Sequence, residues 1–177
     1  MIQAEDPEID NPHLARQVLT IEGQLDRLTQ LLPTDSALAP EQEAFLVHTS
    51  ALVHNAANIY FYTALHSALP STLIVRRLLS DQVFVIKGIP ILRSAHLWSM
   101  FVTALYAFND EERIFFLEQF DKLEEVSATR SSTQAARSIV QTVWKKRDLD
   151  VDSEHMESGI SDWVRFVRPI SEGLSLA

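Results

Sequence analysis

The chain has 177 residues, of which 46% are hydrophobic, and 24 acidic side chains outnumber 15 basic ones to give a net charge of −9. This length fits one folded domain with its own core, and the acidic balance argues against direct binding to nucleic acid, which depends on neutralising phosphates. The absence of cysteine excludes disulfides, thiolate zinc sites and cysteine nucleophiles.

The first part of the chain predicts two long helices. Residues 1–11 are acidic and have no hydrophobic period, so we expect a loose tail without a signal peptide. Apolar residues recur every three or four positions over 12–32 and predict an amphipathic helix. After a loop over 33–40, a nearly continuous apolar pattern over 40–69 predicts a helix that is buried on more than one side.

A further helix is expected from Leu73 to about Lys87, where Gly88 and Pro90 end it. The run Val83–Ile86 is the only β-branched cluster long enough to consider as a strand. No apolar run reaches the ~20 residues of a membrane span, so we expect no membrane partner.

Three helical patterns follow one another between His96 and Asp148. The second begins at Asn109, a good N-cap residue, which is followed by three carboxylates that suit the positive end of a helix dipole. Glu112 is placed to bond back to that cap. The third pattern ends in the basic run 145–147, which we attribute to the helix dipole and not to a nuclear-import or phosphate-binding patch.

The chain is therefore predicted to be all-α, an irregular bundle of about six or seven helices. Trp98 and Trp144 are expected as core anchors, while a short final helix over about 160–167 carries Trp163 near an exposed end. We expect one domain over 12–168 and a short tail over 169–177.

The sequence contains no convincing metal site. His48, His54 and His66 lie on one predicted helix, but their angular and axial separations prevent any two from binding one ion. The run Asp148, Asp150 and Asp152 resembles the start of a calcium loop, although Gly and Glu are missing from the later positions that such a loop needs. We therefore expect neither a metal nor another cofactor.

No catalytic motif is evident either. The nucleophile-elbow, phosphate-loop and dinucleotide-binding patterns are absent, and the pair Glu124-Glu125 sits at a polar helix end where solvent accounts for it. The pair Arg76-Arg77 is expected to be one solvent-facing and one snorkelling side chain. These motifs thus favour a protein that is not an enzyme, with an unrecognised hydrolase as the weaker alternative.

A set of aromatic, small and charged residues also carries a family resemblance. A Trp followed by Phe and small residues, then an acidic helix start with Arg, then a Trp shortly before Arg-Asp, resembles the C-terminal part of the fungal-specific transcription factor domain. The upstream segment 57–61, which contains Tyr60, is similar to a tyrosine-bearing helix of that family. The resemblance covers roughly residues 44–168, and its other positions are Trp98, Phe101, Ala104, Ala107, Glu112, Arg113, Trp144, Arg147, Asp148 and Trp163.

The resemblance implies a noncatalytic helical domain that regulates transcription in the nucleus through protein contacts or effector sensing. In that family a separate cysteine-rich zinc-cluster module binds DNA, so this cysteine-free chain is expected not to bind nucleic acid itself. A protein partner or self-association is expected, because a part of a larger regulatory region exposes apolar surface.

A different class of function remains open from the residues alone. Tyr60, Tyr62, Phe101 and Tyr106 provide an aromatic set that can line a pocket between helices. On this alternative the chain is a helical protein that binds a small molecule.

Overall fold

The computed structural model describes residues 12–29, 31, 38–66, 68–126 and 130–149, and within them the chain is helical without strands. Six α-helices and one short 3-10 turn follow in the order α1 (Pro12–Arg27), α2 (Pro40–Leu65), α3 (Leu73–Lys87), η1 (Ser94–His96), α4 (Leu97–Ala104), α5 (Asp110–Val126) and α6 (Arg130–Leu149). The all-α prediction is confirmed, and the β-branched run near residue 85 lies inside α3. The predicted tails and the helix near 160–167 lie outside the described residues.

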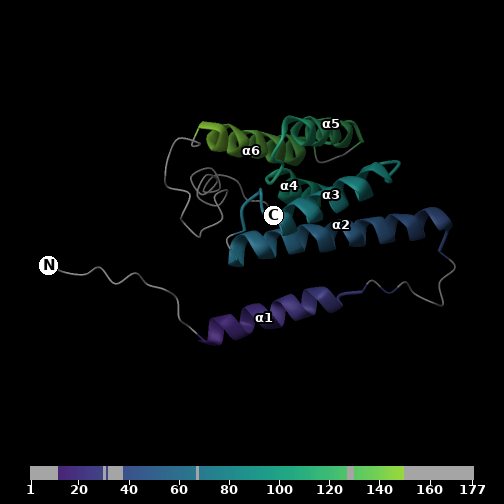
Figure 1. Cartoon of the computed structure of the whole chain (residues 1–177). Helices are drawn as coiled ribbons and strands as arrows, with labels where there is room; N and C mark the ends of the chain where they lie inside the picture. Colours follow the sequence, from purple (N-terminus) through teal and green to yellow (C-terminus); the bar gives the residue numbers. More distant parts are fainter. Residues whose placement is uncertain (1–11, 30, 32–37, 67, 127–129, 150–177) are drawn as a thin grey trace.

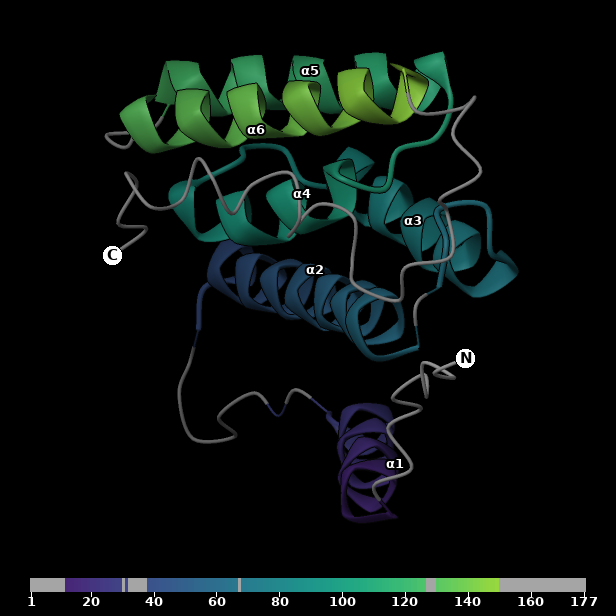
Figure 2. The ribbon, with the colours of Figure 1, turned by 90° about the vertical axis from the view of Figure 1, so that its left-hand side faces the viewer.

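The helices stack in layers around α2 and α4 (Figures 1 and 2). In Figure 2, α5 and α6 run side by side at the top, α4 and α3 form the layer beneath them, and α2 supports that layer from below. The amphipathic α1 lies beyond α2, at the opposite end of the molecule from α5 and α6. As the sequence predicted, α2 has neighbours on more than one side, with α1 on one face and α3 and α4 on another.

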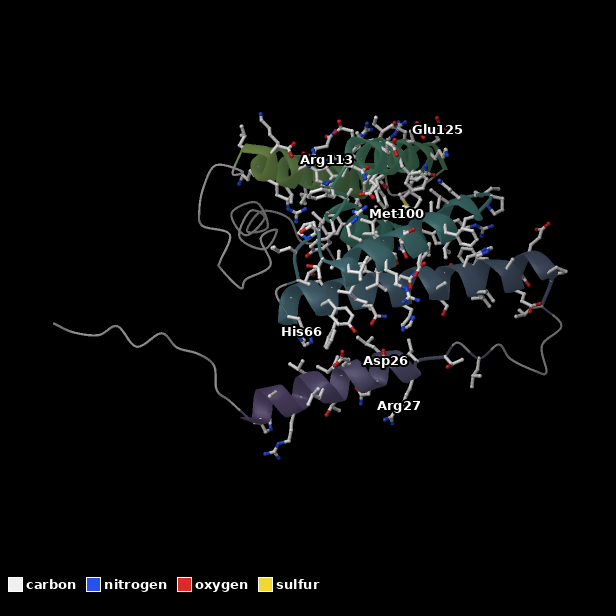
Figure 3. The ribbon with its side chains drawn as sticks, viewed as in Figure 1. Asp26, Arg27, His66, Met100, Arg113 and Glu125 are labelled. Atoms are coloured by element: carbon white, nitrogen blue, oxygen red, sulfur yellow. The ribbon has the colours of Figure 1, made fainter. Side chains whose placement is uncertain are left out.

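Apolar side chains spaced three or four residues apart face inward from every helix between α2 and α6. In α5, Phe116, Phe120 and Leu123 are fully buried, and burial of each contributes about 1.5–3 kcal/mol. Figure 3 shows Met100 of α4 in the middle of the molecule, between α2 and the α5–α6 layer. Other large, almost fully buried apolar side chains are Leu52, Ile59, Leu79, Leu105 and Tyr106.

The first helix is held less tightly than the others. It ends at Arg27, before the end of the apolar pattern, and a tight turn from Leu28 N–H to the Leu25 carbonyl (3.1 Å) follows. Leu28 is 62% exposed, so its apolar side chain finds no core to enter. Two polar contacts join α1 to α2: Tyr62 donates to Glu22 (3.2 Å), and His54 Nε2 lies 2.9 Å from the Leu25 carbonyl.

Among the described helices, none is long and apolar enough to cross a membrane.

Candidate functional site

Several of the residues that carry the family resemblance lie at or against the turn between α4 and α5, which we call the α4–α5 corner (residues 104–112). Helix α4 ends at Ala104, and two tight turns follow, in which Tyr106 N–H bonds to Thr103 and Ala107 N–H bonds to Ala104. Residues 104–107 are all buried, so this backbone is packed inside the molecule and not displayed as a surface loop. Buried turn backbone needs hydrogen-bond partners, and α6 supplies two of them.

The start of α5 is built by local hydrogen bonds. Asn109 Oδ1 accepts the backbone N–H of Glu112 (2.9 Å), as expected for an N-cap residue. The Glu112 carboxylate accepts the backbone N–H of Phe108 (2.9 Å), the residue before the cap, where the sequence predicted a bond to the cap itself. The bond from the Glu112 side chain therefore reaches the residue before the cap, and it holds the end of the α4–α5 corner against the first turn of α5.

Glu112 also ties the corner to α3 through an ion pair. Both guanidinium Nη atoms of Arg76 contact the two carboxylate oxygens, one of them at 2.9 Å, in a bidentate arrangement. Burial favours the protonated carboxyl, but Arg76 and the backbone N–H groups outweigh it, so the pKa of Glu112 is lowered. The hydrogen bond to Glu112 raises the pKa of Arg76. The prediction for Arg76-Arg77 was incomplete: Arg77 is exposed, whereas Arg76 is paired with a carboxylate 36 positions away.

A second ion pair joins α5 to the end of α6. Arg113 binds Asp148 in a bidentate pair at 2.7 and 2.8 Å, and its guanidinium lies 5.5 Å from the ring centre of Trp144. The hydrogen bond from Arg113 lowers the pKa of Asp148, and the same bond raises the pKa of Arg113. Figure 3 shows Arg113 at the α5–α6 layer. Asp148 thus has a structural partner, while the other two carboxylates of its acidic run lie outside the described residues.

Helix α6 completes the corner by binding its backbone. Trp144 donates its indole N–H to the Ala104 carbonyl (2.8 Å), and Arg147 donates to the Leu105 carbonyl. The Arg147 guanidinium also lies 5.3 Å from the ring centre of Tyr106. Arg147 therefore does more than offset the dipole of its own helix, because it donates to the Leu105 carbonyl just after the end of α4.

The other motif residues lie away from the corner or outside the description. Trp144 is 5% exposed and is the predicted core anchor, but Trp98 is 48% exposed, so the core prediction for it was wrong. Helix α4 has only eight residues, and its buried face is formed by residues 99, 100, 102, 103 and 104, which turns Trp98 outward. Tyr60 is 43% exposed on α2, Phe101 is half-buried, and Trp163 lies outside the described residues.

The aromatic set that was considered as a pocket lining is distributed over several faces. Tyr60 and Tyr62 are two residues apart on α2, so their side chains leave the helix about 200° apart. Tyr62 faces Glu22 of α1, whereas Tyr106 is 2% exposed and lies under Arg147 of α6, at the other end of the molecule. A hollow of about 390 Å³ does lie between α1 and α2, but its lining is Gln17, Val18, Thr20, Ile21 and Leu65.

His96 is a buried polar residue whose role the sequence did not predict. His96 is fully buried: its Nδ1 accepts the Arg93 backbone N–H (3.1 Å), so Nε2 carries the proton and donates to Thr49 Oγ1 (3.0 Å). Burial lowers the pKa of His96, and the charges of Arg93 and His48 lower it further. Nothing local marks this role, since the contact with α2 spans 47 positions. Across the described residues, no three His, Asp or Glu side chains are grouped to hold a metal ion.

Comparison with known proteins gives a family but no individual relative. Neither the curated proteins nor the solved structures contain a match. The model of the family described as "fungal specific transcription factor domain" matches residues 3–177, which extends beyond the 44–168 that the sequence motifs covered. The chain therefore belongs to the fungal specific transcription factor domain family.

Proposed function

We propose that the chain is a noncatalytic regulatory domain of a fungal zinc-cluster transcription factor, acting in the nucleus through protein contacts or effector sensing. A role in transcription regulation follows from membership of the family. The finer role rests on how the motif side chains are used in the fold and on the charge and composition of the chain.

The observation that carries the proposal is that the polar groups of the motif side chains are bonded to other groups of this chain. Arg113 binds Asp148, Arg147 binds the Leu105 carbonyl, and Trp144 binds the Ala104 carbonyl. A catalytic group must reach a substrate, whereas these groups bind neighbouring helices. Their arrangement supports a structural role for the motif and a noncatalytic role for the domain.

Composition supports a division of labour with another module. A zinc cluster needs cysteine ligands, and this chain has none, while its net charge of −9 opposes contact with phosphates. We therefore propose that a separate module binds DNA and that this domain contributes through a protein partner or through self-association.

A reporter assay tests the regulatory role. The 177-residue chain is fused to an unrelated DNA-binding module, and transcription from a matching promoter is compared with that from the module alone in fungal cells. We expect the fusion to change transcription, Trp144→Ala to abolish the effect by unfolding the corner, and Lys145→Ala, an exposed neighbour on the same turn, to retain it. Transcription equal to that of the module alone would contradict the proposal.

The hollow between α1 and α2 supports a second candidate function, the binding of a small apolar effector. It is an open depression of about 390 Å³ with the apolar side chains of Val18, Ile21 and Leu65 in its lining, and Ile21 and Leu65 are 42% and 47% exposed, so a ligand would be only partly enclosed. A thermal-shift screen with apolar ligands is expected to find compounds that stabilise the chain but not Leu65→Arg, which places a charge in the lining. Equal shifts for both proteins would locate the binding elsewhere and oppose this candidate.

A further inference from the structure

Helix α3 presents two faces of opposite character. Its buried side packs on α2 through Val75, Leu79, Gln82 and Ile86. On the opposite side, Leu73, Arg77, Ser80 and Phe84 fall within about 40° of one line along the helix, at about 100° per residue. Leu73 is 83% exposed and Phe84 is 79% exposed, which makes them among the most exposed large apolar side chains in the described structure. We call these four residues the α3 stripe.

Leu73 and Phe84 lie at the two ends of this face, about 16 Å apart along the helix, with the polar Arg77 and Ser80 between them. In Figure 2, α3 lies at one edge of the layer that it forms with α4, and no other labelled helix lies on its outer side. All four residues of the stripe are exposed in the described structure.

The spacing of the stripe is symmetric. Its residues are separated by four, three and four positions, so the order read from either end has the same spacing. When two such helices pack antiparallel about a two-fold axis, Leu73 of one copy meets Phe84 of the other, twice. Arg77 meets Ser80 of the second copy in the same way, and the small Ser side chain leaves room for the long Arg side chain. A two-fold interface requires this kind of self-complementary surface.

The charges beside the stripe fit the same arrangement. Arg77 and Asp81 are both exposed, and neither forms an ion pair within the described structure, in contrast to the neighbouring Arg76, which is bound to Glu112. In the antiparallel pair, Arg77 of each copy lies beside Asp81 of the other. Two intermolecular ion pairs therefore flank the apolar contacts and fix the register of the helices.

We propose that the chain forms a homodimer in which α3 packs antiparallel against α3 of a second copy, with Leu73 on Phe84 and Arg77 beside Asp81. A single 15-residue helix covers less area than a standard interface, so we expect a weak dimer, with a dissociation constant of about 10–100 µM. This dimer supplies a face for the protein contacts proposed above, but it follows from the geometry of α3 and does not depend on the transcriptional role.

Charge exchange in the full-length chain tests the register directly by sedimentation equilibrium. Arg77→Glu and Asp81→Arg each place like charges together in both ion-pair positions, and we expect each to weaken dimerisation by about tenfold or more. An equimolar mixture of the two variants brings complementary charges together again, and so does the double variant in one chain. Both are therefore expected to recover the affinity of the original protein, and circular dichroism checks that all variants remain helical.

Two further variants, each of which shortens an exposed apolar side chain, test the apolar contacts of the proposed dimer. Phe84→Ala removes a contact that occurs twice per dimer, and we expect it to weaken dimerisation by about tenfold. Leu19→Ala is the matched control, because Leu19 is 65% exposed on α1, away from the stripe, and its loss should leave the dimer unchanged. A protein that stays monomeric at ~1 mM, well above the expected dissociation constant, would overturn the proposal. Two other results would also overturn it: a dimer whose affinity is unchanged by the α3 variants, and a mixture of the two charge variants that does not regain the original affinity. None of these results would affect the reporter test of the regulatory role, which does not measure dimerisation.

Discussion

The two tryptophans Trp98 and Trp144 give a stringent test of the corner, because the family resemblance treats them alike and the structure does not. Replacing Trp144 by Phe keeps an aromatic ring but removes the indole N–H that binds the Ala104 carbonyl at 2.8 Å. Loss of that hydrogen bond costs about 1 kcal/mol, since Ala104 keeps its second bond from the Ala107 N–H.

The smaller ring adds two further costs. The missing part of the indole leaves a cavity at a side chain that is only 5% exposed, which costs about 1–2 kcal/mol. The weaker attraction of Phe for the Arg113 guanidinium adds about 0.5 kcal/mol. We therefore expect Trp144→Phe to lower the free energy of unfolding by about 2.5–3.5 kcal/mol.

Urea denaturation followed by circular dichroism measures this difference, with Trp98→Phe as the matched control. Trp98 is 48% exposed and lies outside the corner, so its replacement should change the free energy of unfolding by less than about 0.5 kcal/mol. If both substitutions destabilised the protein equally, Trp144 would have no special role in joining α6 to the α4–α5 corner, and the reasoning would be refuted.

Three further substitutions test the polar contacts that join distant helices. Glu112→Gln breaks the bidentate pair with Arg76. Because the pKa of Glu112 is lowered, its stabilisation should be present above pH ~4.5 and be lost as the pH falls below it, so urea midpoints should fall less steeply with acid in the variant than in the original chain. His96 has a lowered pKa, so the unfolded chain binds its proton first, and stability should fall as the pH drops below ~6.5; His96→Gln should flatten that part of the urea-midpoint profile. His54→Ala removes the bond to Leu25, and hydrogen exchange should become faster in α1 while α5 keeps its protection.

Local signals explain which parts of the fold could be predicted from the sequence. The start of α5 depends on Asn109 and the carboxylates that follow it within one turn, so every interaction that defines it is visible in a short stretch of sequence. The end of α3 before Gly88 is equally local. Helix α1 shows the limit of such signals, because its apolar pattern continues past Arg27 although there is no further core for it to enter.

The sequence could predict which residues belong to the motif at the α4–α5 corner, but it could not predict which of them contact one another. Arg113 and Asp148 are 35 positions apart, and Arg147 and the Leu105 carbonyl are 42 apart, so no periodicity links them. The burial of an aromatic residue is decided in the same way by distant neighbours, which is why Trp98 was misjudged. A family pattern records that such residues belong together without stating what they contact.

The positions of the motif residues indicate which surfaces of the domain can select a protein partner. Arg113, Trp144 and Arg147 turn toward neighbouring helices and fix α4, α5 and α6 relative to one another, so their contacts are internal to the domain. A partner protein can contact only side chains that are exposed on the surface. The α3 stripe and the exposed side of α1 carry none of the motif residues, and their side chains can therefore differ between family members without disturbing the corner. We expect the residues that determine which partner binds to lie on these outer faces, which contain none of the residues of the family resemblance.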